Sequence, residues 1–168
     1  MGAVYYPSPP YVINQMLSLG GASSSSIVYD LGCGDGSIVE AAARDYKVKK
    51  AVGIEIDKKL CAIARSKVSK LENAVIINAS YDEVDISEAN LITIYQGAAE
   101  NARLKHKFTD ELKEDSVIVS HEYGIPGWRP AHFYDLNNGR HHYRIFIYLI
   151  QKNTSQRKPA SYFSNRQM

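Results

Sequence analysis

Short apolar runs alternate with amphipathic segments along most of this 168-residue chain. The apolar runs are rich in β-branched residues, as buried strands are, whereas the segments between them repeat apolar residues three and four positions apart, as helices do. This alternation predicts an α/β fold with a mostly parallel, twisted sheet and right-handed crossovers. The expected strands cover residues 27–31, 51–55, 73–78, 91–95, 117–122 and 144–150, with a partner for the last near 131–134.

Helices are expected before or between most of these strands. Ser8 suits the N-cap of the first helix, Pro9 and Pro10 suit its opening turn, and Gly20 and Gly21 end it. No helical pattern precedes the last strand, so the final strands should form an antiparallel C-terminal edge of the sheet. The other expected helices run from the glycine-rich segment to about residue 46, over 58–71 and over 98–113.

A glycine-rich segment follows the strand at 27–31. Gly32, Gly34 and Gly36 alternate with other residues there, which predicts a sharp turn whose backbone lies close to a ligand. The dinucleotide pattern G-x-G-x-x-G needs its third glycine where this chain has Ser37. The spacing therefore differs from the dinucleotide-binding pattern, and a glycine-rich turn of another α/β domain is the alternative.

Carboxylates accompany these glycines. Asp30 precedes the turn and Asp35 lies within it, where they would repel a pyrophosphate but suit a cationic or zwitterionic ligand. The full pattern, D-x-G-x-G-x-G, is similar to motif I of class I S-adenosylmethionine-dependent methyltransferases, whose cofactor carries an amino group and a sulfonium. Glu55 ends the next strand, where an acid should bind the ribose hydroxyls, whereas Asp57 should point to the other side. A solvated acid at a strand end is the alternative for Glu55.

The third strand ends in residues that should meet the adenine of such a cofactor. Ser80 stands where methyltransferases often have an acid or an amide for the adenine amino group, and Asp82 is a candidate to compensate for it. Tyr81 is a candidate to stack on the adenine face, with core packing as an equal alternative.

The fourth strand should lead into an acceptor channel. Tyr95 and Gln96 are candidates to line it, and the helix that follows brings Asn101 near its mouth. Enzymes that methylate adenine or glutamine amides carry an Asn- or Asp-Pro-Pro-aromatic sequence here, and this chain has IYQG instead. The difference argues against an exocyclic amine on a flipped base as the acceptor.

Composition restricts the remaining possibilities. The length predicts one domain, and the net charge of +2 gives no argument for nucleic-acid binding. The two cysteines, Cys33 and Cys61, form neither a disulfide framework nor a metal set, which favours a reducing, cytoplasmic compartment. No signal-peptide or membrane-helix pattern is found. Residues 151–168 form a polar, basic tail that should be mobile, with contact to a nucleic acid or an acidic protein as the alternative.

Several separated motifs resemble the archaeal broad-specificity protein lysine methyltransferase family and its mitochondrial relatives. They are YYPSP at 5–9, YDLGCGDG at 29–36, GIEID at 53–57, DEVDISEAN at 82–90 and VIVSHEYGIPGWRP at 117–130. The resemblance implies a Rossmann-like class I methyltransferase fold over residues 1–150, with residues 1–8 as a lid-like leader. The chain departs from the family pattern at Ser37, Ser80, Gln96, Gly97 and His106.

This resemblance implies S-adenosyl-L-methionine as cofactor and proteins with exposed lysines as substrates, without a metal, a membrane or a nucleic acid as partner. The implied catalytic residues are Tyr5, Tyr95 and Asn101, since hydroxyls, amide oxygens and aromatic faces can hold a neutral amine beside a sulfonium. A frayed terminus is the alternative for Tyr5. The implied cofactor-binding residues are Tyr5, Pro7, Ser8, Asp30, Gly32, Gly34, Glu55, Ile56, Ser80, Tyr81 and Tyr95.

Two rival functions remain at this point. A small-molecule or RNA methyltransferase is one, and the basic tail is its main support; a non-catalytic S-adenosylmethionine-binding module is the other, and the substitutions Ser37 and Ser80 favour it. His121 and Glu122 are adjacent on a strand and should point to opposite faces, so they cannot act together as a base. A structural, hydrogen-bonded position is expected for His121.

Overall fold

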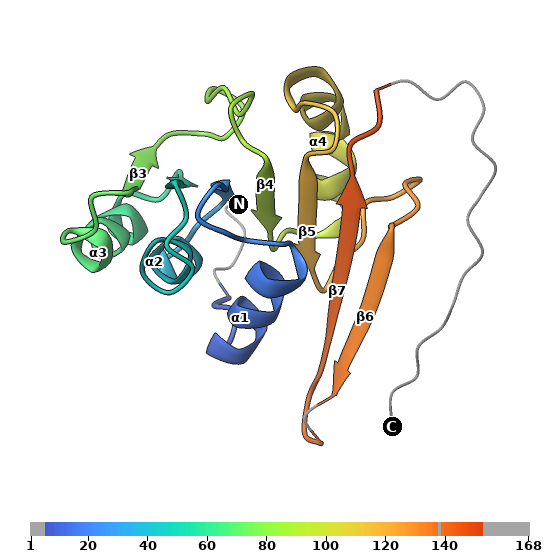
Figure 1. The fold of residues 1–168 in the computed structure, drawn as a ribbon, viewed down its shortest axis with the longest axis horizontal. Coiled ribbons are helices and arrows are strands. Elements are labelled where there is room, and N and C mark those ends of the chain that lie inside the picture. Colours follow the sequence, from blue (N-terminus) through green and yellow to red (C-terminus); the bar gives the residue numbers. More distant parts are fainter. Residues whose placement is uncertain (1–5, 138, 153–168) are drawn as a thin grey trace.

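The computed structural model describes residues 6–137 and 139–152. Tyr5 and the tail from residue 153 lie outside the described residues, so what was predicted for them stays a prediction. Within the described residues, seven strands form one sheet, and four helices pack on it (Figure 1). The elements are α1 (Pro10–Leu19), β1 (Ile27–Leu31), α2 (Ser37–Arg44), β2 (Lys50–Glu55), α3 (Lys58–Val68), β3 (Ala74–Asn78), β4 (Leu91–Ile94), α4 (Ala98–Glu111), β5 (Val117–His121), β6 (His132–Asn137) and β7 (His142–Leu149).

The strand order is β3-β2-β1-β4-β5-β7-β6. Strands β1 to β5 are parallel, β7 is antiparallel to β5, and β6 is antiparallel to β7. The predicted mostly parallel sheet with an antiparallel C-terminal edge is therefore confirmed. The order reverses between β1 and β4, and in open α/β sheets a ligand binds beyond the carboxyl ends of the strands at such a switch point.

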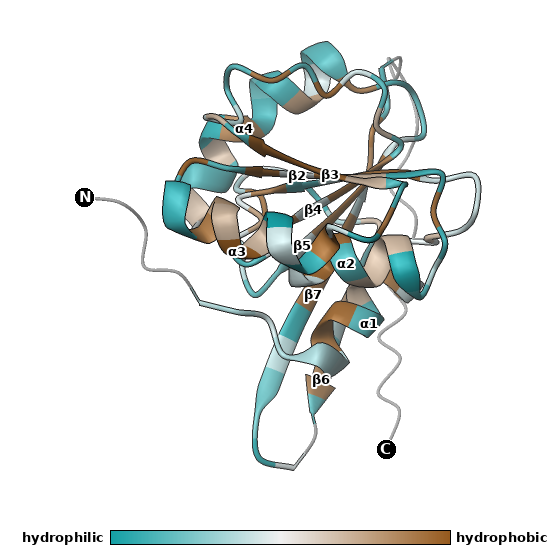
Figure 2. Ribbon diagram, turned by 90° about the vertical axis from the view of Figure 1, so that its left-hand side faces the viewer, coloured by the Kyte–Doolittle hydropathy of each residue, from teal (hydrophilic) through white to brown (hydrophobic). Residues whose placement is uncertain are grey.

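The two faces of the sheet are covered unequally. Helices α1, α2 and α3 pack on one face, whereas α4 lies on the other (Figure 2). On the α4 face, the irregular segments around Ile86 and Ile125 complete the apolar cluster. None of the described helices is long and apolar enough to span a membrane.

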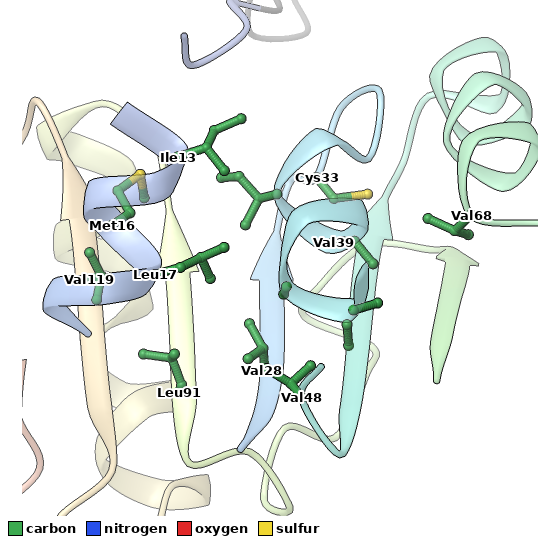
Figure 3. Close-up of a cluster of buried hydrophobic side chains, with 14 of the residues drawn as sticks. Ile13, Met16, Leu17, Val28, Cys33, Val39, Val48, Val68, Leu91 and Val119 are labelled. Carbon is green, nitrogen blue, oxygen red and sulfur yellow. The ribbon is translucent and has the colours of Figure 1, made fainter. Parts of the chain in front are cut away.

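Helix α1 is held by one apolar stripe. Val12, Ile13, Met16 and Leu17 recur at helical spacing and are all buried. Figure 3 shows Met16 and Leu17 beside the strands that carry Leu91 and Val119. The stripe anchors α1 against the middle of the sheet, so the leader that precedes it is carried to the same end as the glycine-rich turn.

Several predicted element ends were wrong. Ser8 is not the N-cap of α1: Pro9 occupies that position, and its side chain has no acceptor to form a cap bond, while the Ser8 hydroxyl bonds to His121. Helix α2 ends at Arg44 and α3 at Val68, earlier than predicted. Strand β6 starts at His132 and, like β7, extends into polar residues, as the pair Asn137 and His142 shows. Pairing within the hairpin, and not an apolar pattern, sets these strand ends.

Candidate active site

The turn after β1 is built from left-handed backbone. Gly32, Gly34 and Gly36 have φ values of 79°, 54° and 79°, which side-chain-bearing residues rarely adopt. The amides of Gly32 and Cys33 donate to the carbonyl of Ile54 at 2.9 and 3.0 Å, which ties the turn to β2. A Cβ on Gly36 would lie 2.8 Å from the Cβ of Ala64, so α3 packs directly on the turn. The predicted sharp turn is therefore present, and it is braced by β2 and α3.

Glu55 lies at the centre of this region. Its carboxylate accepts from the Gly34 amide at 2.8 Å through one oxygen and from the Asp57 amide at 2.9 Å through the other. Each oxygen has a second lone pair, so the buried carboxylate can still accept from two hydroxyls. Asp57 caps α3, accepting from the amides of Lys59 and Leu60.

The two other acids of the turn have different surroundings. Asp30 is buried, accepts from the Thr93 hydroxyl at 2.8 Å, and has its pKa raised to about 7, chiefly by burial. Asp35 is ion-paired with Lys67 at 2.5 Å and bonded to Ser37. A cation from α3 therefore already compensates Asp35, whereas Asp30 has no such partner among the described residues.

A cavity of about 850 Å³ opens beside the turn. It is lined by the leader, the turn, the ends of β2, β3 and β4, and the first part of α4. Nearly all the described residues predicted to bind the cofactor line it, and Gly34 lies behind them, donating to Glu55. The predicted residues in the lining are Pro7, Ser8, Asp30, Gly32, Glu55, Ile56, Ser80, Tyr81 and Tyr95.

An ion-pair cluster that the sequence analysis missed lies at the β3 end of the cavity. Arg103 of α4 pairs with Asp82 at 2.7 Å and Glu100 at 2.6 Å, and its guanidinium lies 5.6 Å from the ring centre of Tyr81. The Tyr81 hydroxyl donates to Glu100. Asp82 is therefore engaged by Arg103, which does not suit the predicted compensation for Ser80. The spacing of Glu100 and Arg103 on one helix face was the available signal.

The opposite end of the cavity is aromatic. Tyr95 follows β4, and its ring centre lies 4.1 Å from that of His121. Burial raises the pKa of Tyr95, and Glu122 acts in the same direction, so its hydroxyl stays neutral. Gln96 donates to the Leu31 carbonyl at 3.1 Å and lies over Gly32, where a Cβ would be 2.3 Å from its nitrogen. The absence of a side chain at Gly32 thus makes room for Gln96.

Asn101 does not line this cavity. Its side chain is fully buried, and its amide nitrogen donates to the carbonyls of Tyr123 and Gly124 at 3.0 and 3.2 Å. The predicted position at the channel mouth is therefore wrong. Asn101 holds the loop after β5, because its amide donates hydrogen bonds to two backbone carbonyls of that loop.

His121 and Glu122 diverge at the end of β5. His121 is buried and hydrogen-bonded, as predicted, whereas Glu122 has a φ of 66° and pairs with Arg144 of β7 at 2.7 Å. Among residues 6–137 and 139–152, no group of three or more His, Cys, Asp or Glu side chains is placed to hold a metal ion.

The sequence of this chain is similar to those of known methyltransferases. The model of the ANTKMT methyltransferase domain matches residues 30–132. A protein-lysine N-methyltransferase of Saccharolobus islandicus is 40% identical over 149 residues, covering 87% of this chain and 92% of that protein. A ribosomal RNA small subunit methyltransferase A of Caldanaerobacter subterraneus subsp. tengcongensis is 36% identical over 77 residues, which is 46% of this chain and 28% of that protein.

Among solved structures, an RNA methyltransferase from Salinibacter ruber in complex with S-adenosyl-L-homocysteine is similar to this chain. The TM-score is 0.84 at 30% identity, over 90% of this chain and 98% of that one. The expected Rossmann-like methyltransferase fold is confirmed by this likeness.

Proposed function

We propose that this chain, which belongs to the family of the ANTKMT methyltransferase domain, methylates lysine side chains of proteins. It is an S-adenosylmethionine-dependent methyltransferase, because its family and fold are those of methyltransferases and a similar structure holds the demethylated product of that cofactor. When bound, the cofactor supplies an electrophilic methyl group on a positively charged sulfur.

The observation that carries the proposal is the charge of the cavity. Its lining includes five carboxylates and one guanidinium, Arg103, which is already paired. In the described part of the chain, Asp30, Glu55 and Asp57 have no ion-pair partner within salt-bridge distance and accept hydrogen bonds instead. Such a site favours an ammonium and a sulfonium and disfavours phosphate groups.

We propose one orientation for the cofactor in this lining. The free lone pairs of Glu55 suit the ribose diol, and Asp30 lies where the glycine turn would meet a cationic group. Ile56 is 72% exposed at the rim and offers an apolar face to the adenine, with Ser80 and Tyr81 beside it. These assignments place the sulfur between the turn and the aromatic end of the cavity.

The acceptor would enter at that aromatic end. A lysine must lose a proton from a group with a reference pKa of about 10.4 before its nitrogen can attack. Tyr95 presents a neutral hydroxyl and a ring, and Pro7 and Ser8 cover the same opening. Partial desolvation there lowers the pKa of the amine, and the aromatic wall aligns it. Tyr5 is proposed to join this wall from the leader.

The test separates acceptor classes. Methyl-labelled S-adenosylmethionine is incubated with protein, RNA and small-molecule fractions, and we expect label in protein, on lysine, by mass spectrometry. A protein fraction whose lysines have been acetylated is the matched control and should take no label. Label confined to RNA or to small molecules would overturn the proposal.

An RNA acceptor is the second candidate, since the similar Salinibacter structure is described as an RNA methyltransferase. The acidic cavity argues against it, because each phosphate near the opening would be repelled. Cofactor binding without turnover on any fraction would indicate a binding module instead.

We also propose a cytoplasmic location. Both cysteines are unpaired and buried, and burial raises the pKa of each thiol, as suits a reducing compartment. Proteolysis of intact and lysed cells, followed by detection of the chain, tests this location.

A further inference from the structure

His121 occupies a position that the methyl-transfer chemistry does not use directly. It ends β5, is 2% exposed and does not line the cavity. Its ring lies between Tyr95, with centres 4.1 Å apart, and Tyr143 of β7, with centres 6.1 Å apart. The imidazole therefore backs the aromatic wall of the cavity from inside the sheet.

The same imidazole also holds the leader. Its Nδ1 lies 2.9 Å from the Ser8 hydroxyl, although the two residues are 113 positions apart. Burial lowers the pKa of His121 to about 4 against the opposing effect of Glu122, so the ring is neutral near pH 7. A neutral imidazole carries one donor and one acceptor nitrogen, and a hydroxyl can serve either, so this bond persists in both tautomers.

The position of Ser8 makes this bond consequential. Ser8 directly precedes the two prolines that open α1, and Tyr6, Pro7 and Ser8 line the cavity. The stripe of α1 fixes the chain after Ser8, whereas Tyr6 before it is 72% exposed. The bond to His121 therefore fixes the leader at Ser8, next to Tyr6 and Pro7, which also line the cavity.

We propose that His121 is a positioning residue that joins the leader to Tyr95, so that one imidazole sets two sides of the acceptor opening. Resting on the proposed function, this inference assigns His121 a role through Ser8 and Tyr95 and no contact with the methyl group. Plain core packing is the competing explanation, and it predicts no linkage between His121 and Ser8.

Two substitutions separate the two contacts. His121→Phe keeps a ring beside Tyr95 but loses the bond to Ser8, whereas His121→Asn keeps a polar atom near the position of Nδ1 but loses the ring. Ser8→Ala removes the bond from the other side, and Ser8→Thr retains the hydroxyl. His106→Phe, at an exposed position of α4, is the matched control.

Steady-state methylation of a lysine-containing protein gives kcat and the KM for each substrate, and calorimetry gives the affinity for S-adenosylhomocysteine. We expect Ser8→Ala and His121→Phe each to reduce kcat/KM about fivefold to tenfold, Ser8→Thr to lose clearly less than Ser8→Ala, and His106→Phe to stay within twofold of the parent protein. The double variant Ser8→Ala/His121→Phe should be no worse than the poorer single variant, because both remove the same bond. His121→Asn should reduce kcat while retaining most of the affinity for the product.

Additive losses in the double variant would overturn the inference, and so would parent values in both single variants. Should His121→Phe fail to fold, the pair Ser8→Ala and Ser8→Thr still decides, because equal values for both exclude the bond. If lysine is not the acceptor, the parent protein will show no turnover. It will still bind S-adenosylhomocysteine, because calorimetry needs no acceptor. Failure of this inference would instead appear as independent effects of Ser8 and His121 on kcat/KM in a parent protein that does turn over.

Discussion

The cofactor side and the acceptor side of the cavity are built differently. The cofactor side joins the turn after β1 to the adjacent strand β2, with Glu55 bonded to Gly34 across 21 positions. The acceptor side joins segments that are far apart in the sequence, with Ser8 bonded to His121 across 113 positions. One side depends on a compact strand–turn–helix unit, and the other exists only when distant segments pack together.

This contrast separates two kinds of failure. Damage to the cofactor side should weaken binding of the cofactor and its product alike, since a carboxylate that would bind the ligand is lost and the amides it accepts from lose their partner. Damage to the acceptor side should leave product affinity intact and reduce turnover, since only the geometry of approach is lost. Three variants test the contrast.

Glu55→Ala should have the largest effect on the cofactor side. It removes the acceptor for the ribose and leaves the amides of Gly34 and Asp57 without a partner. We expect affinity for S-adenosylhomocysteine to fall by about 1.5–3 kcal/mol, or roughly 10- to 150-fold, by calorimetry. Glu72→Ala, at an exposed position between α3 and β3, is the control. An affinity within twofold of the parent would refute the role of Glu55.

Asn101→Leu should act on the acceptor side. The substitution keeps the branched shape of the buried side chain but removes the donor to the Tyr123 and Gly124 carbonyls. We expect the free energy of unfolding to fall by about 1–3 kcal/mol and kcat to drop, with product affinity within twofold. Urea melts, kinetics and calorimetry report these quantities, and Asp110→Ala on the exposed part of α4 is the control. Weakened product affinity would show that the two sides are not separate.

The smallest effect concerns the pH dependence of Asp30. Its pKa in the folded protein, about 7, lies above the ordinary value of about 3.9, mainly through burial. The folded state therefore holds this proton more tightly, and its contribution to stability is complete below about pH 4 and lost as the pH rises to 7. A bound cation lowers the pKa again, so affinity for S-adenosylmethionine should rise up to about tenfold from pH 6 to 8.

Two comparisons check that expectation by calorimetry. S-adenosylhomocysteine lacks the sulfonium charge and should show a weaker rise over the same pH range. Asp30→Asn cannot titrate and should show none of this rise. A pH dependence that survives unchanged in Asp30→Asn would assign it to another group.

Sequence reasoning reached the cofactor side because its contacts are local. The spacing of Asp30, the three glycines and Glu55 follows from a strand, a turn and a helix, and the structure brings them together as expected. The role of Arg103 was missed because one of its partners, Asp82, lies after β3, 21 positions away in the sequence. Ser8 was assigned to the wrong partner, since helix capping is a local rule and His121 is reached only through the completed sheet.

The bond between Ser8 and His121 also bears on how the chain is completed during synthesis. Ser8 emerges from the ribosome long before His121, because His121 lies 113 positions later, at the end of β5. An unfinished chain can form the glycine turn but has nothing to hold its own beginning. The mouth of the cavity is therefore fixed later than the glycine turn, so a nascent chain with a premature stop before β5 would lack this closure.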